Sequence, residues 1–156
     1  MWQVRQSILA RVGLGVAVRS GAQKPEIGTP DALKTTLLKA QSIASIPESA
    51  TGYSIAKVFD RLGITEPMKA KMRAQPNPAQ VVAKGEVELG IFLINVLTAP
   101  GLEVVGPFPA ELQQNVVFTA AVGSETKEAT AAKDLIEYLK GPAAVAIIKS
   151  KSMNPG

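Results

Sequence analysis

The chain has 156 residues, 46% of them hydrophobic, so it can bury one core and does not have the composition of a disordered protein. Its 17 basic and 13 acidic residues give a net charge of +4 but are scattered, so no basic stripe predicts nucleic-acid binding. The sequence contains no cysteine and no histidine, which excludes thiol nucleophiles, structural zinc and imidazole acid–base catalysis by this chain.

The first 22 residues, MWQVRQSILARVGLGVAVRSGA, allow two interpretations. A basic residue (Arg5), an apolar run and the small residues SGA follow one another as in a secretory signal peptide. Arg11 interrupts the apolar run, however, and this disfavours cleavage. We therefore expect residues 1–13 to be a lead-in segment before a strand over GLGVAV. No apolar run reaches the roughly 20 residues that span a bilayer.

Capping residues predict where the first helix begins. Thr29 has the side chain of an N-cap, Pro30 suits the first helical position, and the helix is expected to continue to Lys39. The next segment, SIASI over residues 42–46, has the composition of a short buried strand. Pro47 ends that strand.

Helical spacing of apolar residues predicts a second helix from about Tyr53, closed by Gly63 in the left-handed conformation. Its buried face is expected to consist of Ile55, Val58, Phe59 and Leu62. A short helix is expected within TEPMKAKMRA from about Pro67. Another is expected within QPNPAQVVAKG, with Asn77 as N-cap and Gly85 at its end.

The remaining segments predict strands first and helices last. VELGIFLINVL, LEVVG and NVVFTAAVG are strand candidates, and the final part of the chain contains two helices separated at Gly141. Ser124 or Thr126 is expected to cap the first of these helices. Because strands and helices alternate through the first two-thirds of the chain, we predict an α/β fold with a mostly parallel sheet flanked by helices.

The loop PESATG lies where such sheets bind ligands, between the carboxyl end of a strand and the start of a helix. A helix N-terminus carries unpaired N–H groups and partial positive charge. Ser49, Thr51 and the backbone around Gly52 could therefore hold an oxyanion or a carboxylate. The alternative is that Ser49 or Thr51 only caps the helix. The Gly-Lys-Ser/Thr ending of phosphate-binding loops is absent, so nucleotide hydrolysis has no support.

Three further polar residues are candidates for the same site. Gln75 begins QPNP, which is either a second ligand loop or a rigid turn. Asn95 ends the apolar run GIFLIN and either points into a cleft or ends a strand at the surface. Tyr53, beside the first loop, either lines a pocket or packs.

Four stretches resemble, in their order and spacing, the molybdate-binding-protein-like group of extracellular solute-binding proteins of ABC transporters. They are QSIASIPESATGYSIAKVFDRLGI, VVAKGEVELGIFLINVL, GLEVVGPFPAELQQNVVFTAAV and AAKDLIEYLKGPAAVAIIKSKSMNPG. The resemblance covers the chain from about Leu14 to its end. Its most specific parts are the loop before AKVFDRLG, the entry GEVELGI into a strand, the turn GPFPAELQ and the terminal helix pair.

The resemblance implies a type II periplasmic-binding-protein fold, in which hinge strands join two α/β lobes and a small ligand sits between them without reacting. It also implies an ABC permease as partner and a periplasmic or extracellular location. We expect neither a cofactor nor a metal, since the acidic residues show no clustered ligand spacing. Thr51 falls on the family position whose backbone amide contacts the oxyanion, and Gln75 falls near a second such position. The family's pocket tyrosine falls on Leu93, which cannot donate a hydrogen bond, so another anion or a small organic acid is favoured over molybdate.

Length is the main departure from the family, whose members carry roughly another half-lobe before the position of Leu14. We therefore expect residues 14–123 to form the second lobe with its hinge strands. Residues 124–156 are then the closing helices of a first lobe whose remainder is absent, as in an N-terminally truncated member. Helices with apolar faces and no sheet to cover predict a homo-oligomer, through exchange of these helices between subunits.

A solute-binding module is therefore the favoured function. The alternatives are an effector-sensing domain of the same fold in a regulator, or a remnant that binds nothing. Catalysis has little support, because no identifiable base accompanies the serine, lysine and tyrosine side chains and no pair of carboxylates is apparent.

Overall fold

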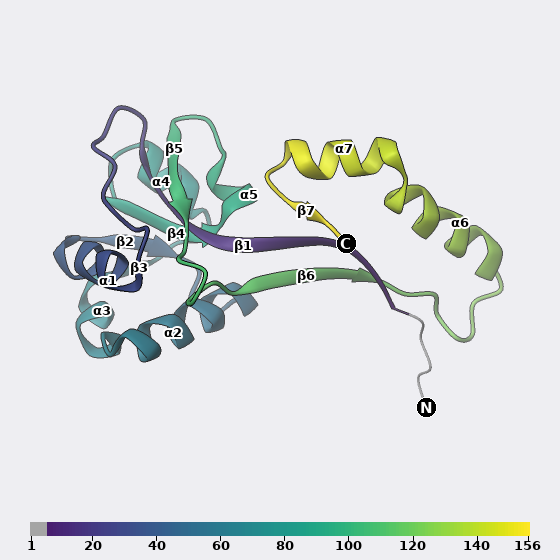
Figure 1. Ribbon diagram of the computed structural model, residues 1–156, viewed down its shortest axis with the longest axis horizontal. Helices are drawn as coiled ribbons and strands as arrows, with labels where there is room; N and C mark the ends of the chain where they lie inside the picture. The colour runs from purple at the N-terminus through teal and green to yellow at the C-terminus, as the bar shows by residue number, and fades with distance from the viewer. Residues whose placement is uncertain (1–5) are drawn as a thin grey trace. The chain divides into compact units, whose positions relative to one another are not determined.

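The computed structural model describes residues 6–156 and divides the chain into two compact units (Figure 1). The larger unit is Gly13–Gln114, and the smaller unit combines the chain up to Val12 with Asn115–Gly156. The chain therefore passes between the units twice, once after Val12 and once after Gln114. Within residues 6–156, no helix is long and apolar enough to cross a membrane.

The larger unit contains five helices and most of the sheet. Its helices are α1 (Pro30–Lys39), α2 (Ala50–Leu62), α3 (Thr65–Lys71), α4 (Pro78–Ala83) and α5 (Ile94–Leu97). Its strands are β2 (Ile43–Ser45), β3 (Met72–Ala74), β4 (Leu89–Leu93), β5 (Leu102–Pro107) and the second part of β1 (Ser7–Arg19). This arrangement confirms the predicted α/β class.

The strand order is β3-β2-β4-β1-β5. Strand β2 pairs in parallel with both β3 and β4, whereas β1 is antiparallel to β4 and to β5. Four strands therefore run in one direction, and the mostly parallel sheet that we predicted is interrupted by β1. Because β2, β3 and β4 are parallel, their carboxyl ends lie at one edge of the sheet, and α2, α4 and α5 begin after that edge.

Buried apolar side chains hold these layers together. All five residues of β4 are buried, as expected for a strand that is covered on both faces. The predicted inner face of α2 is confirmed for Ile55, Val58 and Phe59, whereas Leu62 is only partly buried. The largest fully buried side chains of this unit are Leu14, Leu33, Leu37, Ile43, Ile55, Ile64, Met68, Ile91 and Leu97.

Local capping signals specify the ends of the helices as predicted. The Ala32 N–H donates to Thr29 Oγ1 over 3.1 Å at the start of α1. The Gln80 N–H donates to Asn77 Oδ1 over 3.2 Å at the start of α4. Gly63 ends α2 with a φ of 67°, the left-handed conformation that favours glycine.

Four expectations about element boundaries were wrong. Strand β1 begins at Ser7, so the described part of the expected lead-in is mostly strand; residues 1–5 lie outside the described residues. Residues 72–74 form β3 instead of ending a helix, because they pair with β2. The apolar run after Leu93 turns into α5, since a short apolar run is compatible with either element. Neither Ser124 nor Thr126 is the N-cap of α6; Glu128 holds that position without a side-chain cap.

The smaller unit consists of β6 (Asn115–Ala120), α6 (Ala129–Lys140), α7 (Pro142–Ser150), β7 (Asn154–Pro155) and the first part of β1. Strands β6 and β7 both pair with β1, and α6 packs against α7. Between residues 115 and 156, Ile136 is the one buried side chain. The side chains of Leu135, Tyr138 and Ile147 are 58%, 68% and 62% exposed.

Candidate ligand-binding site

Ser49 is the N-cap of α2, and both functions of its hydroxyl group are used inside the protein. Its Oγ accepts a hydrogen bond from the Gly52 N–H over 2.9 Å and donates one to the Ile46 carbonyl oxygen over 2.6 Å. The capping alternative raised by the sequence is therefore present. A ligand could receive a hydrogen bond from Ser49 only if the bond to Ile46 were broken.

The first turn of α2 still has two free donors. The backbone N–H groups of Ala50 and Thr51 have no acceptor within residues 6–156, whereas the N–H groups of Gly52 and Tyr53 are bound to Ser49. Unpaired amides at a helix N-terminus attract anions, because they add hydrogen bonds to the partial positive charge of the helix. The region around Thr51 can therefore hold an oxyanion without a cationic side chain.

Gly52 is needed at this position because the loop folds closely against the first turn of α2. A Cβ atom on residue 52 would overlap the carbonyl oxygens of Pro47 and Ile46. The oxygen of Ile46 also accepts the hydrogen bond from Ser49, so it cannot move away freely. The glycine in PESATG thus serves close packing of the loop, and its φ is not in the left-handed region.

Gln75 lies beside the end of β2. Its backbone N–H donates to the Ser45 carbonyl oxygen over 3.0 Å and so extends the pairing of β2 with β3. That amide is therefore not free for an oxyanion, and the side chain, which is partly buried, is the group left to contact a ligand. The rigid-turn interpretation also holds in part, because Asn77 two residues later caps α4.

Two buried oxygen atoms near this edge lack hydrogen bonds within the described residues. They are Oδ1 of Asn95, which lies in α5 two residues after the end of β4, and Oγ of Ser45, the last residue of β2. Leaving a buried polar atom unsatisfied costs about 1–3 kcal/mol. Such atoms usually have a water molecule or a ligand as partner. The sequence indicated Asn95 but gave no signal for Ser45, whose isolation depends on its neighbours in the folded chain.

The predicted residues thus come from three segments at the carboxyl edge of β2, β3 and β4. Ser49, Thr51 and Gly52 share one loop, Gln75 is bonded to the end of β2, and Asn95 follows the other neighbour of β2. Tyr53 is 69% exposed, so it does not pack in the core. Within residues 6–156, no three carboxylates gather to hold a metal ion.

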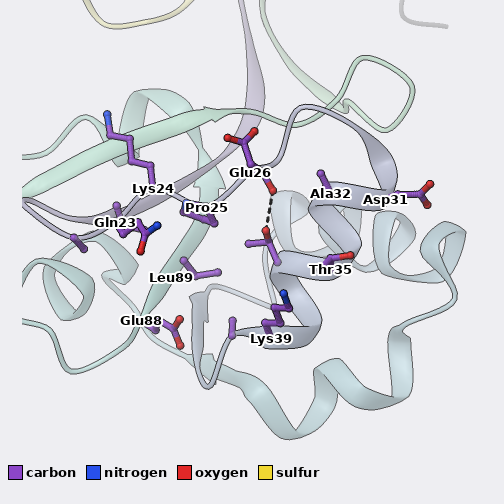
Figure 2. A pocket seen from close by; sticks show the side chains of 14 residues that line it. Gln23, Lys24, Pro25, Glu26, Asp31, Ala32, Thr35, Lys39, Glu88 and Leu89 are labelled. Carbon is purple, nitrogen blue, oxygen red and sulfur yellow. Dashed lines mark hydrogen bonds between the residues drawn. The ribbon is translucent and has the colours of Figure 1, made fainter.

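A separate cavity of about 860 Å³ contains none of these six residues (Figure 2). It lies along α1 and residues 22–26 and reaches Glu88 and Leu89 at the amino end of β4. The candidate site is at the opposite, carboxyl end of that strand. Thr36, on the wall formed by α1, donates from Oγ1 to the Glu26 carbonyl oxygen over 2.8 Å.

Close to this cavity, one carboxyl group has a lowered pKa. The Gly21 N–H donates to Glu103 over 3.1 Å, and Lys24 Nζ lies 3.3 Å from the same carboxylate. The hydrogen bond from Gly21 and then the contact with Lys24 lower the pKa of Glu103. Both groups are exposed to solvent, so this pair contributes little to stability.

Comparison with known proteins identifies the family. The sequence profile of the bacterial extracellular solute-binding proteins matches residues 3–153. The chain belongs to this family. Among curated relatives, the aconitate isomerase of a Pseudomonas species is 37% identical over 156 residues, covering 94% of this chain and 59% of the relative. The molybdate-binding protein ModA of Azotobacter vinelandii is 32% identical over 124 residues, covering 76% of this chain and 49% of the relative.

A solved structure confirms the fold of this solute-binding family member. The periplasmic molybdate-binding protein of Azotobacter vinelandii superposes with a TM-score of 0.71 at 22% identity, over 97% of this chain and 68% of that one. The type II periplasmic-binding-protein fold implied by the sequence is therefore confirmed. The chain spans about half to three-fifths of the length of the curated relatives that it matches.

We predict that Gly52→Ala destabilises the protein by about 2 kcal/mol or more, because the added methyl group overpacks a loop held by hydrogen bonds. Urea unfolding followed by circular dichroism measures the change. Gly28→Ala is the matched control, since a Cβ atom there meets no other atom within 4 Å. Equal stability of the two variants would show that the loop before α2 adapts easily.

Proposed function

We propose that this chain is the solute-binding part of an ABC-type uptake system, and that it holds a small anion or organic acid at the carboxyl edge of β2, β3 and β4 without catalysis. The free N–H groups of Ala50 and Thr51 carry the proposal, because they are adjacent donors at the start of a 13-residue helix. The unsatisfied oxygens of Ser45 and Asn95 support it, since they lie at the same edge.

The ligand we favour is a carboxylate rather than molybdate. Leu93, at the family's tyrosine position, is 7% exposed and offers no hydrogen bond. A tetrahedral oxyanion presents oxygen in every direction and needs donors all around it, whereas an organic acid has an apolar part that an alkyl side chain can contact. The similarity to an aconitate isomerase agrees with this choice, because aconitate is an organic acid.

The chain is proposed to act outside the cytoplasmic membrane. Its proposed partners are an ABC permease and a second copy of the chain. The second copy would cover the exposed apolar side chains of α6 and α7.

Native mass spectrometry should therefore show a dimer or a larger assembly. Leu135→Lys should shift it to monomers, whereas Leu38→Lys, a 38% exposed leucine of the other unit, should not. A wild-type monomer at all concentrations would contradict self-association.

A second candidate function is isomerisation of an unsaturated organic acid, because the aconitate isomerase is 37% identical. Titratable side chains in the loop and first turns of α2 are Glu48, Tyr53 and Lys57, which could transfer protons. Incubation with cis- or trans-aconitate followed by chromatography decides between the two. Conversion that is lost in Tyr53→Phe or Glu48→Gln would favour the enzyme; binding without conversion favours the solute-binding function.

We predict that Ala50→Pro weakens ligand binding about 10-fold or more, because it removes one of the two free donors. Proline suits this first helical position, and Ser49 already has the extended backbone (φ −114°, ψ 162°) that a following proline requires. The variant should therefore keep its fold. Isothermal titration with a panel of small carboxylates and molybdate measures the loss.

Ala50→Gly and Thr51→Ala are the controls, since both keep the backbone N–H groups. They should bind within about 2-fold of the wild type if the amides hold the ligand. Equal losses in Ala50→Pro and Ala50→Gly would point to helix stability, and a large loss in Thr51→Ala alone would assign the role to the hydroxyl group.

A further inference from the structure

The side-chain amide of Gln113 forms a compact hydrogen-bond network with the backbone of Leu14. The Leu14 N–H donates to Gln113 Oε1 over 2.7 Å, and Gln113 Nε2 donates to the Leu14 carbonyl oxygen over 2.9 Å. The Gln114 N–H donates to the same Oε1 over 3.0 Å. Both acceptor positions of Oε1 are therefore occupied, and the amide is fixed in one orientation.

Gln113 takes the place of a strand partner for β1. Strand β5 pairs with β1 as far as Pro107 opposite Gly15, and the Phe108 N–H then donates to the Leu14 carbonyl oxygen over 3.0 Å. The Leu14 N–H finds its acceptor in the side chain of Gln113 instead of in a neighbouring strand. Leu14 is fully buried, so an unpaired N–H at this residue would be costly.

The network lies at both points where the chain passes between the two units. Gly13 and Leu14 begin the larger unit after the first passage, and Gln113 and Gln114 end it before the second. Leu14 and Gln113, which lie beside the two passages, are 99 residues apart in sequence, yet one side chain joins them within the larger unit.

Gly13 makes room for this side chain. A Cβ atom on residue 13 would lie 2.9 Å from both Cδ and Nε2 of Gln113 and 3.1 Å from Oε1. The end of a flexible side chain could normally move aside. Here three hydrogen bonds hold the amide, so the space at Gly13 and the position of Gln113 depend on each other.

We propose that Gln113 is a positioning residue that ties the two inter-unit connections together, so that β1 and the segment leading into β6 act as a single hinge. The tie is contained in the larger unit and does not require the smaller unit to adopt a particular placement. A role of this hinge in ligand binding rests on the proposed function. The test of the Gln113 contacts needs no ligand, so the hinge proposal and the proposed function can fail separately.

Amide hydrogen exchange in the full chain tests the tie. Gln113→Ala should speed exchange of the Leu14 and Gln114 amides by about 10-fold, because each loses its acceptor, while the amides of β4 remain protected. Gln114→Ala is the matched control, since its side chain takes no part in the network, and it should leave both amides protected. Equal exchange in the two variants would overturn the proposal.

Two further variants separate hydrogen bonding from simple space filling. Gln113→Glu keeps an acceptor for the two N–H groups but replaces the donor Nε2 with an oxygen that repels the Leu14 carbonyl oxygen. The Leu14 amide should therefore be less protected than in the wild type and more protected than in Gln113→Ala. Gly13→Ala should lower the melting temperature in the wild type but have little further effect in Gln113→Ala, as expected for coupled residues. Additive effects of these two substitutions would contradict the tie.

Discussion

Backbone pairing along β1 is the constraint on which the rest of the structure depends. This one strand pairs with β4 and β5 in the larger unit and with β6 and β7 in the smaller unit. Because β1 lies between β4 and β5 in the sheet, it separates β5 from the three parallel strands whose carboxyl ends form the candidate site. The site therefore belongs to the larger unit, and Leu14, the second residue of that unit, pairs with Leu93 at the carboxyl end of β4.

The candidate site depends on which polar groups the fold has already satisfied. The Gly52 N–H donates to the Ser49 hydroxyl and the Gln75 N–H donates to the Ser45 carbonyl oxygen. Neither of these two N–H groups is therefore free for a ligand. The Ala50 and Thr51 amides and two buried oxygens are left. A donor pair at a helix start suits one anionic group. The Ser45 hydroxyl can donate or accept a hydrogen bond, whereas Oδ1 of Asn95 needs a donor. A partly protonated or hydroxylated organic acid, or a bridging water molecule, meets both requirements.

Sequence reasoning worked best where the signal is local. The N-caps at Thr29 and Asn77, the closing Gly63 and most of the buried face of α2 follow from a few neighbouring residues, and the structure has them as predicted. Family resemblance supplied the two-lobed fold, which periodicity alone does not specify. The loop before α2 also contains a helix start with free donors, as the sequence indicated, although the single donor of the Ser49 hydroxyl is already used inside the protein.

Features that depend on distant residues were missed for a physical reason. Strand β3 is three residues long and exists because β2 pairs with it, so it has no periodic pattern of its own. The start of α5 after Leu93 is likewise ambiguous in an apolar run. The roles of Ser45 and Gln113 depend on what surrounds them in space, and the partner of Gln113 is 99 residues away.

The most direct test of the central claim is nuclear magnetic resonance of the ¹⁵N-labelled protein during titration with small carboxylates and molybdate. One of these anions should shift the amide signals of Ala50 and Thr51 most strongly, while the amide signals of Gly52 and Gln75, already bonded inside the protein, should move less. Saturable shifts centred on the cavity along α1, or no saturable shift with any of the anions, would contradict a ligand site at the carboxyl edge of β2, β3 and β4.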